Sequence, residues 1–303
     1  PSEFRLATKP WNAKKIEKIG DGKLIDFGKE TFGYIKINGL KGKGNLALYY
    51  GESREEALDS EKCETLDYIH FDGNQPKEYT HNKSKAFRYV QVQADATLEY
   101  DSISMLHEYL PLEYRGEFKS SDDLLNDIWD VSAYTMHLTS REFFIDGIKR
   151  DRWIWSGDAY QSYLMNYYLF FDSTSVERTL IALRGKDPVT AHVNTIMDYS
   201  LYWFMGIYDY YLYTGDTSFI KTFYPRMKTL MEFCLGRRNK NGFLEPLEGD
   251  WVFIDWADGL AKTGEVSFEQ MLLVRSLEAI AVSADIAGEN PHKPIKRIIH
   301  NGI

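Results

Sequence analysis

A chain of 303 residues, 44% apolar and 27% charged, has the composition of a globular protein and the length of one large domain or two average ones. Its net charge of −9 makes nucleic acid an unfavourable partner, because acidic surfaces repel phosphate, and no apolar run is long enough to span a membrane. The 15% aromatic content suits a packed core, and it equally suits a site where sugar rings stack on Trp and Tyr.

The two cysteines, Cys63 and Cys234, have no metal-ligand spacing and are predicted to be free, buried thiols. The chain begins with Pro1 and has no apolar stretch typical of a signal peptide. We therefore expect it to start inside a longer polypeptide, and its cellular compartment stays open.

The first third of the chain has the residue pattern of β-strands. Apolar and polar residues alternate in runs at 23–28, 33–37, 45–51 and 87–94, separated by clusters of Gly, Asn and Lys. Such alternation places one face of each strand in a core and the other in water. The runs predict an antiparallel β-sandwich over residues 20–112. Residues 1–19 are predicted to be a linker or the remnant of a preceding domain.

After Gly116 the apolar period becomes helical. A first helix is expected to carry its apolar face on Leu124, Leu125, Ile128 and Val131. Further helices are predicted at about 157–172, 174–185, 196–214, 217–237 and 266–288. These elements make residues 113–303 an all-α domain.

A short internal repeat supports paired helices. The run Tyr167–Phe170 is followed by Thr174-Ser175, and the run Tyr210–Tyr213 is followed by Thr217-Ser218, 43 residues later. A repeat of that size matches one helical hairpin, and stacked hairpins form solenoids or helical toroids.

The densest polar segment lies between two predicted helices, at residues 145–158. It contains three carboxylates, three cations and two tryptophans. A solvated, salt-bridged connection is the alternative, although such a loop has little use for two Trp side chains. Carboxylates bind vicinal hydroxyls by charge-assisted hydrogen bonds, and a nearby Trp raises the pKa of a carboxylic acid. Since glycoside hydrolysis uses a pair of carboxyl groups, the segment predicts a sugar pocket.

A second candidate site lies in the long connection at residues 239–265. It carries Trp251, followed by Asp255 and Trp256. Long ordered loops in compact domains usually have a function, although two buried Trp side chains would also pin such a loop. We include these three residues among the candidate substrate-binding residues.

The polar segment resembles the signature of the bacterial α-L-rhamnosidase family. Asp146-Gly147, then Arg150-Asp151-Arg152, then Trp155-x-Gly157-Asp158 match an Asp, an Arg-Glu-Arg triplet and a Trp-x-Gly-Asp motif. Residues 26–34 and 50–53 look like the β-sandwich that precedes the catalytic domain in that family. Residues 199–203 and 213–216 look like its later helices, so the similarity covers nearly the whole chain.

The resemblance implies a β-sandwich in front of an (α/α)6 barrel that hydrolyses terminal α-L-rhamnosyl linkages with inversion, without a metal or cofactor. It implies that Asp151 is the general acid and that Asp146 and Asp158 bind rhamnose hydroxyls. Arg150 and Arg152 would flank the acid. The pocket wall would be formed by Trp203 and Trp251, and the substrate-binding residues would also include Trp155, Arg150 and Arg152.

Two departures from the family pattern matter. Asp151 stands where the family usually has Glu, which retracts the proton by about 1.5 Å, and an uncompensated shift of that size costs ~10²-fold in rate. About six helices are predicted where the barrel needs twelve, so half a barrel is expected, with the general base beyond Ile303. The chain alone is then inactive, and a second copy is a candidate to cover the open barrel.

Two alternatives are retained. In the first, the chain is a non-catalytic carbohydrate-binding or degenerate homologue. In the second, it is a helical-toroid glycosidase with another sugar specificity. Turnover of an aryl rhamnoside separates catalysis from mere binding, and a panel of aryl glycosides separates the sugar specificities.

Overall fold

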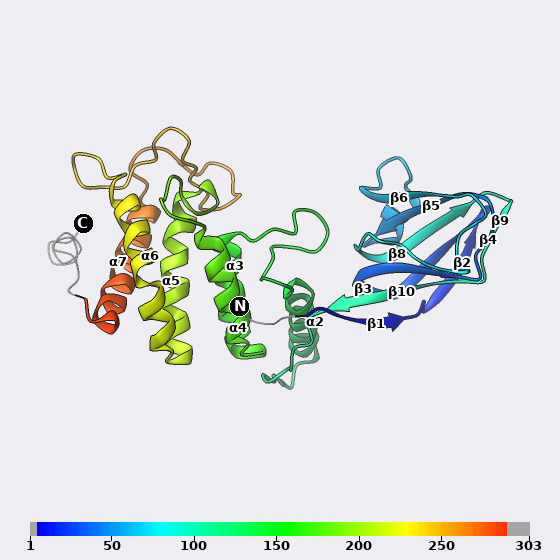
Figure 1. Cartoon of the computed structure of the whole chain (residues 1–303), viewed down its shortest axis with the longest axis horizontal. Coiled ribbons are helices and arrows are strands. Elements are labelled where there is room, and N and C mark those ends of the chain that lie inside the picture. The colour runs from blue at the N-terminus through cyan, green and yellow to red at the C-terminus, as the bar shows by residue number, and fades with distance from the viewer. Residues whose placement is uncertain (1–4, 290–303) are drawn as a thin grey trace.

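The structure is a computed structural model that describes residues 5–289. It has an antiparallel β domain followed by a helical domain, joined where β10 leads into α2 (Figure 1). The strands are β1 (Ala7–Trp11), β2 (Lys15–Ile19), β3 (Gly22–Asn38), β4 (Lys41–Gly42), β5 (Gly44–Gly51), β6 (Thr65–Phe71), β7 (Glu78–Thr80), β8 (Lys85–Ala94), β9 (Leu98–Glu99) and β10 (Ser102–Tyr109). This order of a β region before a helical one confirms the predicted fold class.

The long strand β3 organises the β domain. The sheet has the order β1-β10-β3-β8-β5-β6, and β2 and β7 also pair with β3, while β4 and β9 form a separate ladder. The pairing of β3 with β8 shifts register between Asp26 and Thr31, where Gly28 adopts φ +91°. Such a bulge bends a strand, so β3 contributes Ile25, Phe27, Ile35 and Ile37 to a single buried core.

The assignment of residues 1–19 to a linker or domain remnant is wrong for the described part of that segment. β1 pairs with β10, and β2 pairs with β3, so both strands belong to the sheet. The Trp11 indole also donates to the carbonyl of Phe27 at 3.1 Å. Both strands are rich in Lys and largely exposed, so the apolar alternation that reveals a strand is weak there.

The helices lie close to their predicted positions. They are α1 (Arg54–Leu58), α2 (Asp123–Thr139), α3 (Ser156–Leu169), α4 (Ser173–Arg184), the 3-10 turn η1 (Val193–Thr195), α5 (Met197–Thr214), α6 (Thr217–Leu235) and α7 (Ser267–Ala287). α5 packs against both α3 and α7 (Figure 1). The Tyr167 and Tyr213 rings stack 4.1 Å apart at the ends of α3 and α5.

Several helices expose apolar side chains. The apolar face of α2 was expected to be buried, but in the described residues no element covers it. Exposed apolar residues lie on α2 (Leu124, Leu125, Ile128, Val131), α3 (Met165, Tyr168), α5 (Leu212) and α7 (Met271, Val274). Uncovered faces of this kind are consistent with part of an (α/α)6 barrel. None of the helices within residues 5–289 has the length and apolar character needed to cross a membrane.

A buried glutamate makes stability depend on pH. Glu269 of α7 is 1% exposed, and its carboxyl oxygens have no hydrogen-bond partner among the described residues. Burial raises the pKa of Glu269 to about 8. Because this folded-state pKa lies above the unfolded one, the stability that Glu269 contributes is present below about pH 4.5 and is lost as pH rises through 8.

We expect the free energy of unfolding to fall between pH 6.5 and 8, with Glu269 contributing up to about 1.4 kcal/mol per pH unit. The variant Glu269→Gln should remove that share of the slope in urea titrations at each pH. Burial holds the pKa of His107 and of His192 at about 4, so neither titrates in this window. An unchanged slope in the variant would show that Glu269 is ionised at pH 6.5.

Candidate active site

The segment between α2 and α3 forms a closed loop. The amide of Asp146 donates to the carbonyl of Trp153, and the amide of Trp153 donates to Oδ1 of Asp146, both at 3.0 Å. These two bonds tie the ends of the excursion 147–152 together. Asp151 lies on this excursion, next to Arg152, which has the strained φ of +51°.

The start of α3 is held by a side chain from a distant loop. Oδ1 of Asn194 accepts from the amide of Ser156, and Nδ2 of Asn194 donates to the carbonyl of Ile154, both at 3.0 Å. Asn194 has φ +54°, a left-handed conformation that Asn tolerates better than most residues. The contact fixes Trp155 at the N-cap and Asp158 in the first turn of the helix.

The loop 251–256 is fastened to the start of α5. Trp251 accepts from the amide of Met197 at 2.8 Å, and its own amide donates to the carbonyl of Thr195 at 3.1 Å. The buried carboxylate of Asp198 accepts from the amides of Phe253 at 3.3 Å and Ile254 at 2.8 Å. Ile254 has φ +57°, which is rare for a β-branched residue and is held by these bonds.

The three segments enclose one cavity of about 250 Å³. It is lined by Asp146, Asp151, Trp155, Asp158, Ile196, Tyr199, Trp251, Phe253 and Trp256. The aromatic rings form a continuous wall, with the rings of Phe253 and Trp256 5.0 Å apart and those of Tyr199 and Phe253 5.8 Å apart. Six of the ten predicted site residues therefore meet in one place, although they come from segments about a hundred residues apart.

The other four predicted site residues do not line this cavity. Trp203 is only 1% exposed and lies in the core, where its indole donates to the carbonyl of Leu180 at 2.8 Å. Asp255 is exposed and accepts from the amide of Ala257 at 2.8 Å.

Arg150 and Arg152 turn away from the cavity toward the β domain. Arg150 forms an ion pair with Glu64, and Arg152 donates to the carbonyl of Ser84. Both arginines were candidate substrate-binding residues because the family resemblance places them beside Asp151. Neighbouring side chains on an extended loop, however, point in different directions.

Three further lining residues were not predicted from the sequence as site residues: Ile196, Tyr199 and Phe253. A signal for Tyr199 lies in the Trp-x-Gly-Asp motif, because a Cβ at Gly157 would come within 2.7 Å of the Tyr199 ring. A glycine is therefore required where that ring crosses α3. Ile196 and Phe253 carry no polar group that suggests sugar chemistry.

Asp158 has the most clearly perturbed carboxyl in the cavity. Although more than a third of the residue is accessible, protein atoms crowd the carboxyl, and this desolvation raises its pKa. The hydrogen bond from Tyr199 Oη, at 3.2 Å, opposes the rise, and the charge of Asp146 adds to it. Burial raises the pKa of Tyr199 as well, so the phenol stays protonated and donates.

A second cavity, of about 940 Å³, lies between the helical domain and the β domain. Residues of α2, the loop 146–151 and the sheet line it, including Glu30, Tyr134 and Ile148. Asp146 and Asp151 line both cavities, so the loop that carries them separates the two spaces. Within residues 5–289, no group of three or more His, Cys, Asp or Glu side chains is arranged to hold a metal ion.

Two family descriptions match successive parts of the chain. Residues 1–92 match the N-terminal domain of alpha-rhamnosidase-like proteins of Bacteroidetes, and residues 113–295 match the bacterial alpha-L-rhamnosidase six-hairpin glycosidase domain. The chain belongs to the bacterial α-L-rhamnosidase family. The resemblance predicted from residues 146–158 is thereby confirmed.

Similar α-L-rhamnosidases are longer than this chain. The α-L-rhamnosidase of Formosa agariphila is 22% identical, in an alignment that covers 81% of this chain and 30% of that protein. The family 78 rhamnosidase of Bacillus sp. GL1 superposes with a TM-score of 0.80 at 22% identity, over 94% of this chain and 31% of that one. The rhamnose-bound rhamnosidase of Klebsiella oxytoca also gives 0.80, at 21% identity, over 98% and 69%. These structures share the fold, and the chain spans about a third of the first two relatives.

Proposed function

We propose that this chain supplies the acid side of the active site of an enzyme that cleaves terminal α-L-rhamnosyl residues from glycans or plant glycosides. The observation that carries the proposal is the cavity in which Asp146, Asp151 and Asp158 meet a wall of aromatic rings. Carboxylates accept hydrogen bonds from sugar hydroxyls, and the rings pack against the C–H faces and the methyl group of a 6-deoxy sugar.

Each carboxylate has a role in the proposal. Asp151 protonates the glycosidic oxygen as the bond to the anomeric carbon breaks, because it lines both the small cavity and the larger space beyond. Asp146 is fixed by its bonds to Trp153 and binds a hydroxyl. Asp158, paired with Tyr199, binds another.

Inversion requires a second carboxylate that activates water on the opposite face of the sugar. The three carboxylates that line the small cavity all come from residues 146–158. We propose that the general base comes from a segment outside residues 5–289 and that the chain alone does not turn over. This same observation favours the second candidate function, a carbohydrate-binding homologue without catalysis.

The larger cavity is proposed to receive the leaving group. A rhamnosyl unit in the small cavity places its glycosidic oxygen at Asp151, so the remainder of the substrate continues across the loop into the space beside Tyr134 and Ile148. The lining combines apolar side chains with more carboxyl groups than cations, the cations being Lys29, Lys149 and Arg150. A lining of this kind suits an uncharged sugar or phenol.

Titration of the chain with L-rhamnose tests the proposed function. We expect binding with a Kd on the order of 1 mM, about −4 kcal/mol, and no binding of L-fucose at the same concentrations. An aryl α-L-rhamnoside should bind without being hydrolysed. Multiple turnover would place a base among residues that the proposal treats as structural, and equal binding of both sugars would point to another specificity.

Trp251→Ala should weaken rhamnose binding by about threefold to tenfold, because the ring lines the cavity. Trp153→Ala is the matched control, since Trp153 is an exposed tryptophan of the same site region that does not line the cavity. Isothermal titration calorimetry on both variants compares them directly. Equal losses in the two variants would argue against the aromatic wall.

A further inference from the structure

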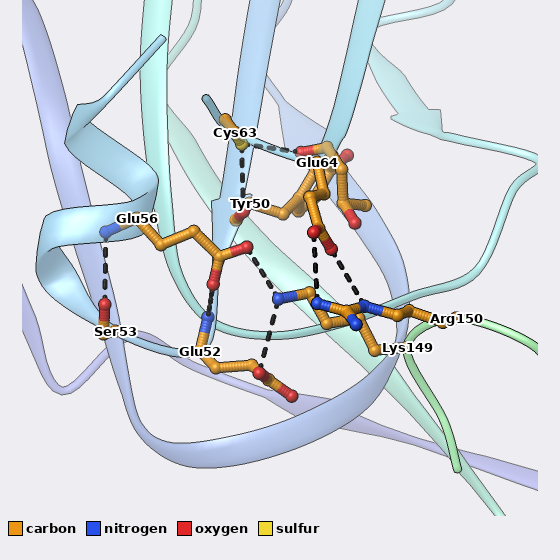
Figure 2. A network of polar contacts seen from close by, with 9 residues as sticks. Tyr50, Glu52, Ser53, Glu56, Cys63, Glu64, Lys149 and Arg150 are labelled. Carbon is orange, nitrogen blue, oxygen red and sulfur yellow. Dashed lines mark hydrogen bonds and ion pairs between the residues drawn. The ribbon is translucent and has the colours of Figure 1, made fainter. Parts of the chain in front are cut away.

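Three cations surround Asp151 in sequence, and each reaches the β domain. Lys149 contacts Glu52 and Glu56, and Arg150 pairs with Glu64 (Figure 2). Arg152 follows Asp151 and contacts the chain before β8. The loop that carries the proposed acid therefore belongs to the helical domain by sequence but is held by the other domain.

The ion pair of Lys149 is better protected from water than that of Arg150. Its Nζ lies 2.7 Å from Oε1 of Glu56 and 3.3 Å from Oε2 of Glu52, and the Lys149 and Glu56 side chains are only 15% and 20% exposed. A largely buried ion pair of this kind orders its partners more strongly than an exposed one.

Glu56 is held in position by contacts within the β domain that do not involve Lys149. Its Oε2 accepts from the amide of Glu52 at 3.0 Å, and its amide donates to the N-cap Oγ of Ser53 at 3.1 Å (Figure 2). These bonds close the first turn of α1 around the carboxylate. Lys149 therefore binds a carboxylate whose position is fixed by the β domain.

The two arginines complete the attachment. Arg150 donates through Nε and a terminal nitrogen to both Glu64 oxygens, at 3.0 and 3.1 Å, in an exposed bidentate pair. The guanidinium of Arg152 donates to the carbonyls of Ile148 at 2.9 Å and Ser84 at 3.2 Å. It also lies 4.9 Å from the centre of the Phe32 ring, over a residue of β3.

Asp151 has no comparable support of its own. Among the described residues, no hydrogen bond or ion pair holds its carboxyl group, so its position follows from the backbone at 149–152. We propose that the β domain positions the general acid: Glu56, with help from Glu64, acts through Lys149 and Arg150 as a positioning residue for Asp151. This inference rests on the proposed function, because it assumes that Asp151 faces the sugar.

The consequence is a coupling between the domains at the site. If Lys149 loses its anchor, Asp151 is free to shift relative to Tyr199 of α5 and to Trp251, which is bonded to the start of α5. Small displacements of groups that contact a ligand are costly in affinity and in rate. The β domain is then part of the binding site although none of its residues lines the small cavity.

The test is calorimetric titration of the full chain with L-rhamnose, with melting temperature and hydrogen exchange at residues 147–153 as parallel measurements. Lys149→Met should weaken binding by about 2- to 30-fold and speed exchange in the loop. Glu56→Gln should weaken it in the same direction, and the double variant should be no worse than Lys149→Met alone, because the loss of Lys149 already removes the contact with Glu56. Lys149→Arg should restore binding to within about twofold.

Arg54→Met is the matched control. Arg54 lies on the same helix as Glu56 and forms a bidentate pair with Glu17 at 2.8 and 3.0 Å, away from the loop. The variant Arg54→Met should leave the Kd for L-rhamnose unchanged. If Lys149 has only a structural role, Lys149→Met should lower the melting temperature or the fraction of chain that binds rhamnose. The Kd of the folded fraction would then stay the same, and this result would overturn the proposal.

The two proposals fail separately. If the unaltered chain binds no rhamnose, the proposed function is rejected, and hydrogen exchange in Lys149→Met still reports whether the β domain anchors the loop. If the unaltered chain binds and the variants bind equally well with unchanged exchange, only the positioning role is lost.

Discussion

Replacing Asp151 with Asn is expected to abolish hydrolysis of alkyl α-L-rhamnosides in a polypeptide that contains this chain and turns over rhamnosides. Loss of a general acid costs about 10²–10⁴-fold in rate. The loss should be much smaller for aryl rhamnosides with acidic phenols, because a good leaving group departs with little protonation. Steady-state kinetics on the two substrate kinds measure the difference.

Two variants control this experiment. Asp151→Glu keeps a proton donor, with the longer reach of the usual family residue, and should keep the wild-type ratio of alkyl to aryl hydrolysis. Asp158→Asn removes a group proposed to bind a hydroxyl and should reduce both substrates alike. An equal loss of both substrates in Asp151→Asn would assign Asp151 to binding instead of proton transfer.

Replacing Asp198 with Ala is expected to destabilise the helical domain and to open the aromatic wall. Asp198 is 0% exposed, and it accepts the amides of Phe253 and Ile254. Phe253 and Ile254 are half-buried, and an amide that is shielded from water and loses its acceptor costs about 1–3 kcal/mol, so unfolding should become easier by up to roughly 6 kcal/mol. Since Trp251 and Trp256 lie on the same loop, rhamnose binding should be lost even in the chain that stays folded.

Urea unfolding and rhamnose titration of the variant measure the two effects. Asp209→Ala is the matched control on α5, because Asp209 accepts from the Tyr160 hydroxyl at 2.9 Å away from the loop. It should lower stability and leave the affinity for rhamnose unchanged. Full affinity in the folded fraction of Asp198→Ala would mean that Trp251, through its bonds to Thr195 and Met197, suffices to hold the wall.

Local features of the chain were readable from sequence. The helices α3 to α7 begin and end near their predicted residues, because apolar spacing and turn residues act over a few positions. The three carboxylates of the site were found for the same reason. Asp146, Asp151 and Asp158 lie within thirteen residues, so one loop and one helical turn bring them together.

Contacts between distant segments were decided by the tertiary structure. Trp251 and Trp256 join the carboxylates only because the loop 251–256 is bonded to Asp198 and Thr195. From the sequence, Trp203 and Trp251 were equal candidates for the pocket wall. Trp203 lies in the core because it is on the inner side of α5.

The sequence likewise did not reveal in which direction each side chain near Asp151 points. Asp151 itself was identified from the residue pattern around it. Arg150 and Arg152 flank it in the chain, but their partners are Glu64 and the Ser84 carbonyl of the β domain. The sequence therefore indicated which groups are proposed to carry the chemistry. Packing of the two domains decided which of them face the cavity, because ion pairs and buried amides are satisfied by partners far away along the chain.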